Sequence, residues 1–458
     1  MGAGRLASMV FLAVVIVSLL NYFSTSDANE IQDKDWDPFL RAMRKRCAPI
    51  YEGLLNRDSV ASPYLGETYA LNARVVCILP SGTFLHDGRH ERSLIQGRGV
   101  TADPLHFDGL AGTYYPLHRG VESPLVMHES MAMVMASRDN YHLFHFLCDG
   151  VIGAMSTILN TDNLKATPRS AVFIEDFLVS KLPVSWPTSW NIVKEWTSVL
   201  GSNISDAPLI YTRDITNNVT HCFCGSLIAH ASKYRRRVQY MKQTARAGDP
   251  GFEALHAVRV LLMERYQLPR YGSPSDLGIA QRAGLWKTAV EGRPLLLLHT
   301  RSNREINDIR SVVLAAEVVG FSVEVMDSAN VSPRLHVIAA RFADVFLAVH
   351  GAELSYVFLM ESDGVNICRS VIELNAWVRH GDVPFFQIEA NMASLSYTLV
   401  QPYGVVFRDR SLRKPSKLSF DNLRRSQLLS YDINKIKAAL SAAHKRWSVC
   451  ASKELRAG

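Results

Sequence analysis

Two arginines stand in a polar segment that directly follows an apolar run. Arg301 and Arg304 come after the run 295–299, and Asn307 lies three residues beyond Arg304. Arginine carries a permanent positive charge on a planar group, and it binds phosphate through two parallel hydrogen bonds. Two such groups in one loop could hold a diphosphate. A surface loop with ordinary salt bridges is the alternative, and this segment alone does not decide between them.

A second set of polar residues follows another apolar run. His350 and Gly351 come directly after the run 345–349, and Glu353 stands two residues after Gly351. Glycine lets the backbone approach a ligand closely, and histidine supplies a donor or an acceptor. Glu373 ends a further apolar run, where a carboxylate can accept the hydroxyls of a ribose. If these runs are parallel strands, both sets converge on the edge of the sheet where open α/β folds bind ligands.

A third candidate lies in the first half of the chain. His145 and Asp149 are four residues apart in a segment, 141–159, whose apolar spacing predicts a helix, so they share one face of it. A histidine beside a carboxylate can act as a general base. Polar pairing inside the core is the alternative interpretation of this pair. Glu175 and Asp176, after the predicted strand 171–174, are rival candidates for the base.

The elements that position the arginines are predicted clearly from residue 293 onward. Strands at 295–299, 321–326 and 345–349 alternate with a helix at 308–319 and a second helix that begins after Ser332. Unbroken apolar strands that alternate with helices are typical of a parallel sheet covered on both faces. The segment 74–285 alternates less regularly and is predicted to be a separate α/β domain. The basic end of the chain contains a further predicted helix at 432–447.

The N-terminus predicts entry into the secretory pathway. Arg5 precedes an apolar run at 9–20, and an acidic tract follows, which orients the segment with its C-terminal side outside the cytosol. The run is short for a membrane span, so an uncleaved signal anchor and a cleaved signal peptide both remain open. In either case the body of the protein is lumenal. Asn203 and Asn218 then stand in acceptable N-glycosylation sequons.

Cysteine usage and charge exclude several classes of protein. The seven cysteines are too dispersed for a zinc motif, so two or three lumenal disulfides are expected, with the pairing open. The net charge of +7 is mild for 458 residues, and the basic runs lack interleaved aromatic residues, which favours a small anionic ligand over DNA or RNA. Hydrolase and P-loop motifs are absent. The only D-x-D motifs lie at 33–37, outside the candidate region, so no metal ion is expected.

Taken together, the motifs resemble those of glycosyltransferase family 61. The family includes plant β-1,2-xylosyltransferases, the EGF-domain O-GlcNAc transferase and the O-mannose β-1,4-N-acetylglucosaminyltransferase. The resemblance covers about residues 130 to 400 and rests on five motifs in order: His145-x-x-x-Asp149, Cys222-Phe223, Arg301-x-x-Arg304-x-Ile306-Asn307, His350-Gly351-Ala352-x-Leu354 and Val371-Ile372-Glu373-Leu374.

This resemblance implies an α/β protein of GT-B architecture, in which two Rossmann-like domains face each other across a cleft. It implies an inverting transferase that moves a sugar, GlcNAc or xylose first, from a UDP-sugar to a hydroxyl of a glycan or glycoprotein. The enzyme would be a single-pass type II protein of the Golgi or endoplasmic reticulum membrane with its catalytic domain in the lumen. The implied divisions are a signal anchor or signal peptide at 1–23, a stem at 24–60, an acceptor-side domain at 61–285, a nucleotide-sugar domain at 286–405 and a helical tail at 406–458.

Each site residue has an implied role in this scheme. Asp149 or His145 would be the catalytic base, and the UDP-sugar would be held without a required cofactor or metal. The implied nucleotide-sugar ligands are Arg301, Arg304 and Asn307 at the diphosphate, His350, Gly351 and Glu353 along the nucleotide, and Glu373 at the ribose.

Two residues depart from the family pattern. Glu353 stands where the family often has a second glycine, and Arg310 stands where it has an acidic residue. Both departures keep an alternative open, namely a catalytically silent lumenal protein of the same fold that binds a nucleotide sugar or a glycan.

Overall fold

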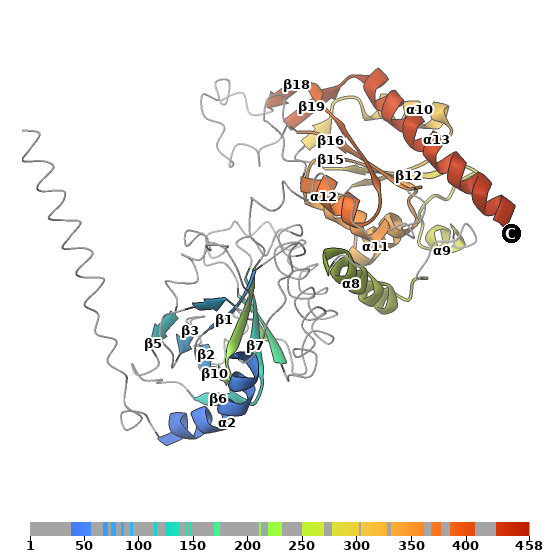
Figure 1. Cartoon of the computed structure of the whole chain (residues 1–458). Coiled ribbons are helices and arrows are strands. Elements are labelled where there is room, and N and C mark those ends of the chain that lie inside the picture. Colours follow the sequence, from blue (N-terminus) through green and yellow to red (C-terminus); the bar gives the residue numbers. More distant parts are fainter. Residues whose placement is uncertain are drawn as a thin grey trace, which may run out of the picture.

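A five-stranded parallel sheet forms the core of the C-terminal half (Figure 1). In this computed structural model the described residues are 38–55, 67–71, 75–78, 84–86, 92–94, 114–116, 124–136, 143, 147, 169–174, 210–211, 219–230, 250–269, 277–301, 304–327, 331–360, 368–376, 385–407 and 427–457. The predicted N-terminal membrane segment, His145, Asp149, Glu175, Asp176, Asn203 and Asn218 lie outside them. Within the described residues, no helix has the length and apolar character needed to cross a membrane.

The strands of this sheet follow the order β14-β12-β15-β16-β17, and every neighbouring pair is parallel. Numbered along the chain, this order is 2-1-3-4-5, one of the two common doubly wound arrangements. The predicted strands are therefore present, and β17 extends the sheet by one more. The strands are β12 (Leu295–Thr300), β14 (Ser322–Asp327), β15 (Val345–Val349), β16 (Ser370–Leu374) and β17 (Ser396–Val400).

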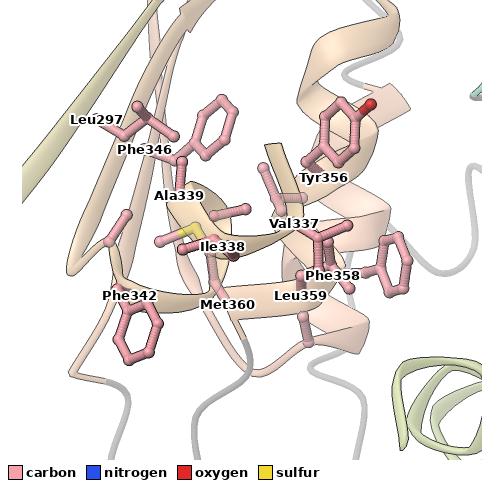
Figure 2. Close-up of a cluster of buried hydrophobic side chains, with 14 of the residues drawn as sticks. Leu297, Val337, Ile338, Ala339, Phe342, Phe346, Tyr356, Phe358, Leu359 and Met360 are labelled. Carbon is pink, nitrogen blue, oxygen red and sulfur yellow. The ribbon is translucent and has the colours of Figure 1, made fainter. Parts of the chain in front are cut away.

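Helices cover both faces of the sheet because successive residues of a strand point to opposite faces. On one face, Leu295 and Leu297 pack with α11 (Pro333–Phe342), the 3₁₀ helix η8 (Ala352–Met360), α12 (Phe385–Met392) and α8 (Pro250–Tyr266). Figure 2 shows the centre of this cluster, where Leu297 and Phe346 lie against α11 and η8. On the other face, Leu296 and Leu298 pack with α10 (Ile309–Val319) and α13 (Ile433–Ala457).

The two predicted helices that connect strands of this sheet, α10 and α11, begin at capping residues, and α10 ends at a glycine. The carboxylate of Asp308 accepts a hydrogen bond from the N–H of Ser311 at the start of α10, and Gly320 ends the helix with a φ of 113°. Such a left-handed conformation favours glycine. The hydroxyl of Ser332 accepts a hydrogen bond from the N–H of Leu335, and Pro333 occupies the first turn of α11.

A small three-stranded sheet contacts the parallel sheet through β13, which lies near β12 and β15. Its order is β13-β19-β18, formed by β13 (Arg304–Ile306), β19 (Gln427–Tyr431) and β18 (Pro402–Phe407). β13 follows Arg301 closely, so the arginine segment is tied to the C-terminal end of the chain through β19. The predicted helix at 432–447 is present as the longer α13, which packs along α10 (Figure 1).

The described part of the N-terminal half contains two mixed sheets with the orders β4-β1-β11-β7-β8-β9 and β5-β3-β2-β10-β6. The first consists of β1 (Glu67–Leu71), β4 (Arg92–Leu94), β7 (Met131–Ala136), β8 (Arg169–Ile174), β9 (Ile210–Tyr211) and β11 (Ser226–His230). The second consists of β2 (Val76–Ile78), β3 (Phe84–His86), β5 (Tyr114–Pro116), β6 (Leu125–His128) and β10 (Thr220–Phe223). The predicted strand at 171–174 corresponds to β8.

Within the described residues, three disulfides join distant parts of the chain. Cys47 of α2 (Pro38–Leu55) binds Cys224, and Cys77 of β2 binds Cys222 of β10. Cys222 in β10 and Cys224 just after it are therefore bonded to two different elements, β2 and α2. Cys368 binds Cys450, which fixes α13 to the start of β16. The sequence predicts two or three disulfides with open pairing, and the described residues contain three.

The predicted domain boundary at 285/286 and the two facing Rossmann-like domains remain predictions. Two elements that precede the boundary contact the parallel-sheet layer. α8 packs against α12 and η8, and α9 (Leu277–Arg282) packs against α11.

Candidate functional site

The arginine segment and the histidine-glycine segment meet at the point where the strand order of the parallel sheet reverses. From β12 the chain passes through α10 to β14 on one side, and it then returns through α11 to β15 on the other side. Arg301 directly follows β12, and His350 directly follows β15. A crevice opens at the carboxyl ends of the strands at such a switch point, and open α/β sheets bind their ligands there.

Arg301 and Glu353 form an ion pair across this point. Nη1 of Arg301 lies 2.8 Å from Oε2 of Glu353, and their side chains are 16% and 15% exposed. Burial opposes ionisation of Glu353, but attraction to Arg301, then to His299, outweighs it and holds the pKa of the carboxyl below its ordinary value. Glu353 is therefore an anion in this site, and it already neutralises one of the two arginines.

Gly351 is the floor on which the Arg301 guanidinium lies. A Cβ atom at position 351 would stand 1.5 Å from Nη1 of Arg301 and 2.9 Å from Oε2 of Glu353. No side chain fits at such distances unless the guanidinium moves. Glycine is required at position 351 because the guanidinium lies so close to the backbone. The sequence analysis attributed the same lack of a side chain to close contact with a ligand.

Arg304 fastens the two loops to each other. Its Nη1 donates a hydrogen bond to the backbone carbonyl of His350. Burial, followed by repulsion from Arg301, lowers the pKa of Arg304 to about 10, so it stays protonated at neutral pH. Two guanidinium groups and one carboxylate thus share a partly buried site, with one positive charge in excess.

Glu373 lies buried behind His350. One carboxylate oxygen lies 2.5 Å from Nδ1 of His350, and the other accepts a hydrogen bond of 2.6 Å from the hydroxyl of Tyr397. The ring of Phe386 packs edge-on against His350 with a centroid distance of 5.2 Å. Both carboxylate oxygens thus contact protein, and these contacts orient the imidazole. The assignment of Glu373 to the ribose hydroxyls remains a prediction.

Three stacked aromatic rings, those of His299, His336 and Tyr356, are buried near Arg301. The ring of His299 stacks on His336 with a centroid distance of 5.1 Å, and His336 stacks on Tyr356 at 4.8 Å. His299 is 1% exposed, and neither of its ring nitrogens makes a hydrogen bond of normal geometry within the described residues, although the backbone of Thr300 acts on the ring. Burial, followed by repulsion from His336, lowers the pKa of His299 to about 3. This imidazole is therefore neutral, and no sequence motif marked it as a site residue.

Asn307 lies against the small sheet. Its backbone N–H donates to the carbonyl of Leu429, and its side-chain amide donates to the hydroxyl of Ser430 at 3.2 Å. It thus organises the connection between β13 and β19. Its proposed contact with the diphosphate remains a prediction.

The structure therefore gathers Arg301, Arg304, His350, Gly351, Glu353 and Glu373 at one edge of one sheet. Sequence reasoning missed three neighbours of this cluster. Tyr397 donates to Glu373, Phe386 packs on His350, and His299 interacts electrostatically with Arg301 and Glu353. Tyr397 and Phe386 belong to β17 and α12, elements that were not predicted. His299 stood at the end of a predicted strand, where its apolar neighbours marked it as buried.

The chemistry available at this edge is anion binding by fixed guanidinium groups. Among the described residues, no group of three or more histidine, cysteine, aspartate or glutamate side chains is placed to hold a metal ion. The sequence matches no protein-family model, and it matches no curated protein. The likeness to glycosyltransferase family 61 rests on the sequence motifs alone.

Proposed function

We propose that this protein is an inverting glycosyltransferase that uses a UDP-sugar. It transfers GlcNAc or xylose to a hydroxyl of a glycan or glycoprotein in the Golgi or endoplasmic reticulum. The observation that carries the proposal is the presence of Arg301 and Arg304 beside His350 and Gly351 at the switch point of the parallel sheet. The motifs that resemble family 61 supply the reaction type.

The guanidinium groups have a defined task in this reaction. The acceptor hydroxyl oxygen attacks the anomeric carbon, the bond from that carbon to the diphosphate breaks, and UDP leaves with the electron pair. Negative charge grows on the leaving diphosphate, and fixed positive groups stabilise it without reorganising. Arg301 and Arg304 are partly buried and held by neighbouring groups, so they fit this task.

Inversion also requires a base that takes the proton of the acceptor hydroxyl on the face opposite to UDP. Asp149 or His145 is proposed for this role, with Glu175 and Asp176 as rivals. A GT-B arrangement would bring the first half of the chain to the nucleotide half. The three disulfides support a lumenal location.

Calorimetric titration of the lumenal chain with UDP tests the anion site. Arg304→Ala is expected to weaken UDP binding by about tenfold or more, because a charge-assisted contact and the link to the His350 carbonyl are both lost. Arg293→Ala is the matched control, since Arg293 is exposed and lies two residues before β12, at the end of the strand opposite to Arg301. Equal UDP affinities of Arg304→Ala and the parent protein would refute the phosphate role.

A catalytically silent binder of nucleotide sugars or glycans is the second candidate. The observation in its favour is the Arg301–Glu353 pair, which already neutralises one arginine of the site. A panel of UDP-sugars and acceptors separates the two functions. Release of UDP with transfer to an acceptor supports the enzyme, whereas UDP binding with neither hydrolysis nor transfer supports the silent binder.

A further inference from the structure

Glu353 holds the position that an anionic ligand would take on Arg301. Its Oε2 forms an ion pair with Nη1 of Arg301 at 2.8 Å, so it stands where a phosphate oxygen would pair with the same guanidinium. The pair stands at the carboxyl end of β12, at the strand switch point. A carboxylate of the chain and a phosphate of a ligand would therefore compete for the same donor.

The surroundings leave Arg301 little freedom to serve both anions. Its guanidinium lies on the backbone of Gly351, where even one added carbon would stand 1.5 Å away. Arg304 is committed to the carbonyl of His350. With Glu353 in place, the three charged groups carry one net positive charge, which is a poor match for a diphosphate.

We propose that Glu353 is a built-in competitor of the donor diphosphate, which must leave Arg301 before a nucleotide diphosphate can bind. This inference rests on the proposed function and adds a regulatory residue to it. Glu353 thereby opposes binding, rather than lining the nucleotide as the sequence motif suggested. It also selects against weak anions, because a ligand must bring enough negative charge to replace a fixed carboxylate.

The neighbourhood of Glu353 offers a place for the displaced side chain. Glu353 and His299 interact electrostatically, and at most one ring nitrogen of His299 is engaged, by the backbone of Thr300, while neither makes a hydrogen bond of normal geometry within the described residues. An imidazole N–H in that position can donate to a carboxylate. The Glu353 carboxylate can therefore find a new partner after it leaves Arg301. An unpaired buried carboxylate would be costly, and that cost would oppose ligand binding.

The test compares the UDP affinities of the parent protein and a set of its variants by calorimetry. Glu353→Gln keeps the shape of the side chain and removes its charge, and it is expected to bind UDP about fivefold to tenfold more tightly than the parent protein. Glu317→Gln is the matched control, because Glu317 is exposed on α10 and carries the same charge. It is expected to leave the affinity unchanged.

The double variant Arg301→Ala/Glu353→Gln, measured beside Arg301→Ala, shows whether the effect passes through the arginine. The gain from Glu353→Gln is expected to vanish when Arg301 is absent, because the competition needs both groups. A gain that persists without Arg301 would overturn the inference. Inorganic pyrophosphate is the second probe. Glu353→Gln is expected to raise the affinity for pyrophosphate by the same factor as the affinity for UDP, since Glu353 competes with the phosphates and not with the uridine.

The outcomes separate this inference from the proposed function. If UDP binds the parent protein and Glu353→Gln binds it equally or more weakly, the competitor role is wrong and the UDP site stands. If UDP binds neither the parent protein nor Glu353→Gln at millimolar concentration, both the inference and the proposed function are wrong. Unfolding curves of each variant show that the chains are folded, and Glu353→Ala provides a second neutral variant, with the same expected gain, should Glu353→Gln fold poorly.

Discussion

Glu373 holds His350 in place: its Oε1 lies 2.5 Å from Nδ1 of the imidazole, at the end of the strand next to the one that precedes His350. Its second oxygen accepts a hydrogen bond from Tyr397 on the following strand. Three successive parallel strands thus contribute to one polar chain behind the candidate site. The carboxylate accepts from the two donors through two separate oxygens, whereas an amide has one oxygen and a nitrogen that only donates.

Glu373→Gln is therefore expected to destabilise the protein. The amide nitrogen would replace one of the two accepting oxygens. Facing the imidazole N–H it would be a second donor, and facing Tyr397 it would make the hydroxyl the acceptor. In either case hydrogen bonds to a charged acceptor become weaker neutral ones or are lost, at a cost of about 1–3 kcal/mol. Urea unfolding measures this free energy. Tyr397→Phe removes one hydrogen bond and keeps the carboxylate, so it is expected to cost about 1 kcal/mol. Equal stability of Glu373→Gln and the parent protein would contradict the role of Glu373 as acceptor of both bonds.

Gly351→Ala should separate binding from folding. The added Cβ would meet the far end of a flexible side chain, Nη1 of Arg301 at 1.5 Å, so the guanidinium moves and the backbone stays. UDP affinity is expected to fall by about tenfold, since Arg301 leaves its position over the site, while the thermal midpoint shifts little.

Gly278→Ala is the control for this variant, because its added Cβ would make only an ordinary contact of 3.4 Å with Arg282. Loss of the native fold in Gly351→Ala, with no soluble protein, would show that the backbone at Gly351 cannot tolerate the carbon. Unchanged UDP affinity would show that Arg301 is not a ligand.

Reduction is expected to weaken the first half of the chain. The Cys77–Cys222 bond closes a loop with a sequence separation of 145 residues, and a cross-link of this kind stabilises by about 2–4 kcal/mol, chiefly through the unfolded state. The double variant Cys77→Ser/Cys222→Ser should therefore have a lower thermal midpoint than the parent protein. Peptide mapping without reductant should recover the Cys47–Cys224 and Cys368–Cys450 pairs in both proteins. A different pairing in the parent protein would contradict the structure.

The strands and helix ends around the site could be predicted because their signals are local. Unbroken apolar runs mark β12 and β15, and Ser332 with Pro333 marks the start of α11. Parallel strands that end at one edge bring Arg301 and His350 together without any further information. This explains why residues of two distant motifs could be assigned to one site from the sequence.

The partners of these residues could not be predicted, because they depend on side-chain directions and on distant elements. Arg301 pairs with Glu353 only because Gly351 lets the guanidinium lie on the backbone. Tyr397 reaches Glu373 from β17, an edge strand whose residues are mostly half-buried and give a weak pattern. The disulfide pairing required the register of β10 with β2, which no local signal contains.

His299 makes acid stability a test of the buried ring stack. Its pKa is about 3 in the folded protein, because of burial and then repulsion from His336, and 6.5 in the unfolded chain. Below pH 6.5 the unfolded chain therefore binds a proton that the folded protein rejects, so stability is complete above that pH and is lost as the pH falls toward 3. The loss approaches about 1.4 kcal/mol per pH unit for one such group. Burial also lowers the pKa of His336, which adds to the effect.

Urea unfolding between pH 7.5 and 4.5 measures this slope. His299→Phe keeps an aromatic ring against Phe346 and removes the titrating group, so its stability is expected to fall less steeply with acidification than that of the parent protein. Phe346→Leu controls for packing, because it disturbs the same stack while the histidine remains. That variant is expected to be less stable at every pH and to keep the parent slope. If His299→Phe and the parent protein have the same slope, the imidazole at position 299 is protonated in the fold, and its interaction with Glu353 is then an ion pair rather than a contact with a neutral ring.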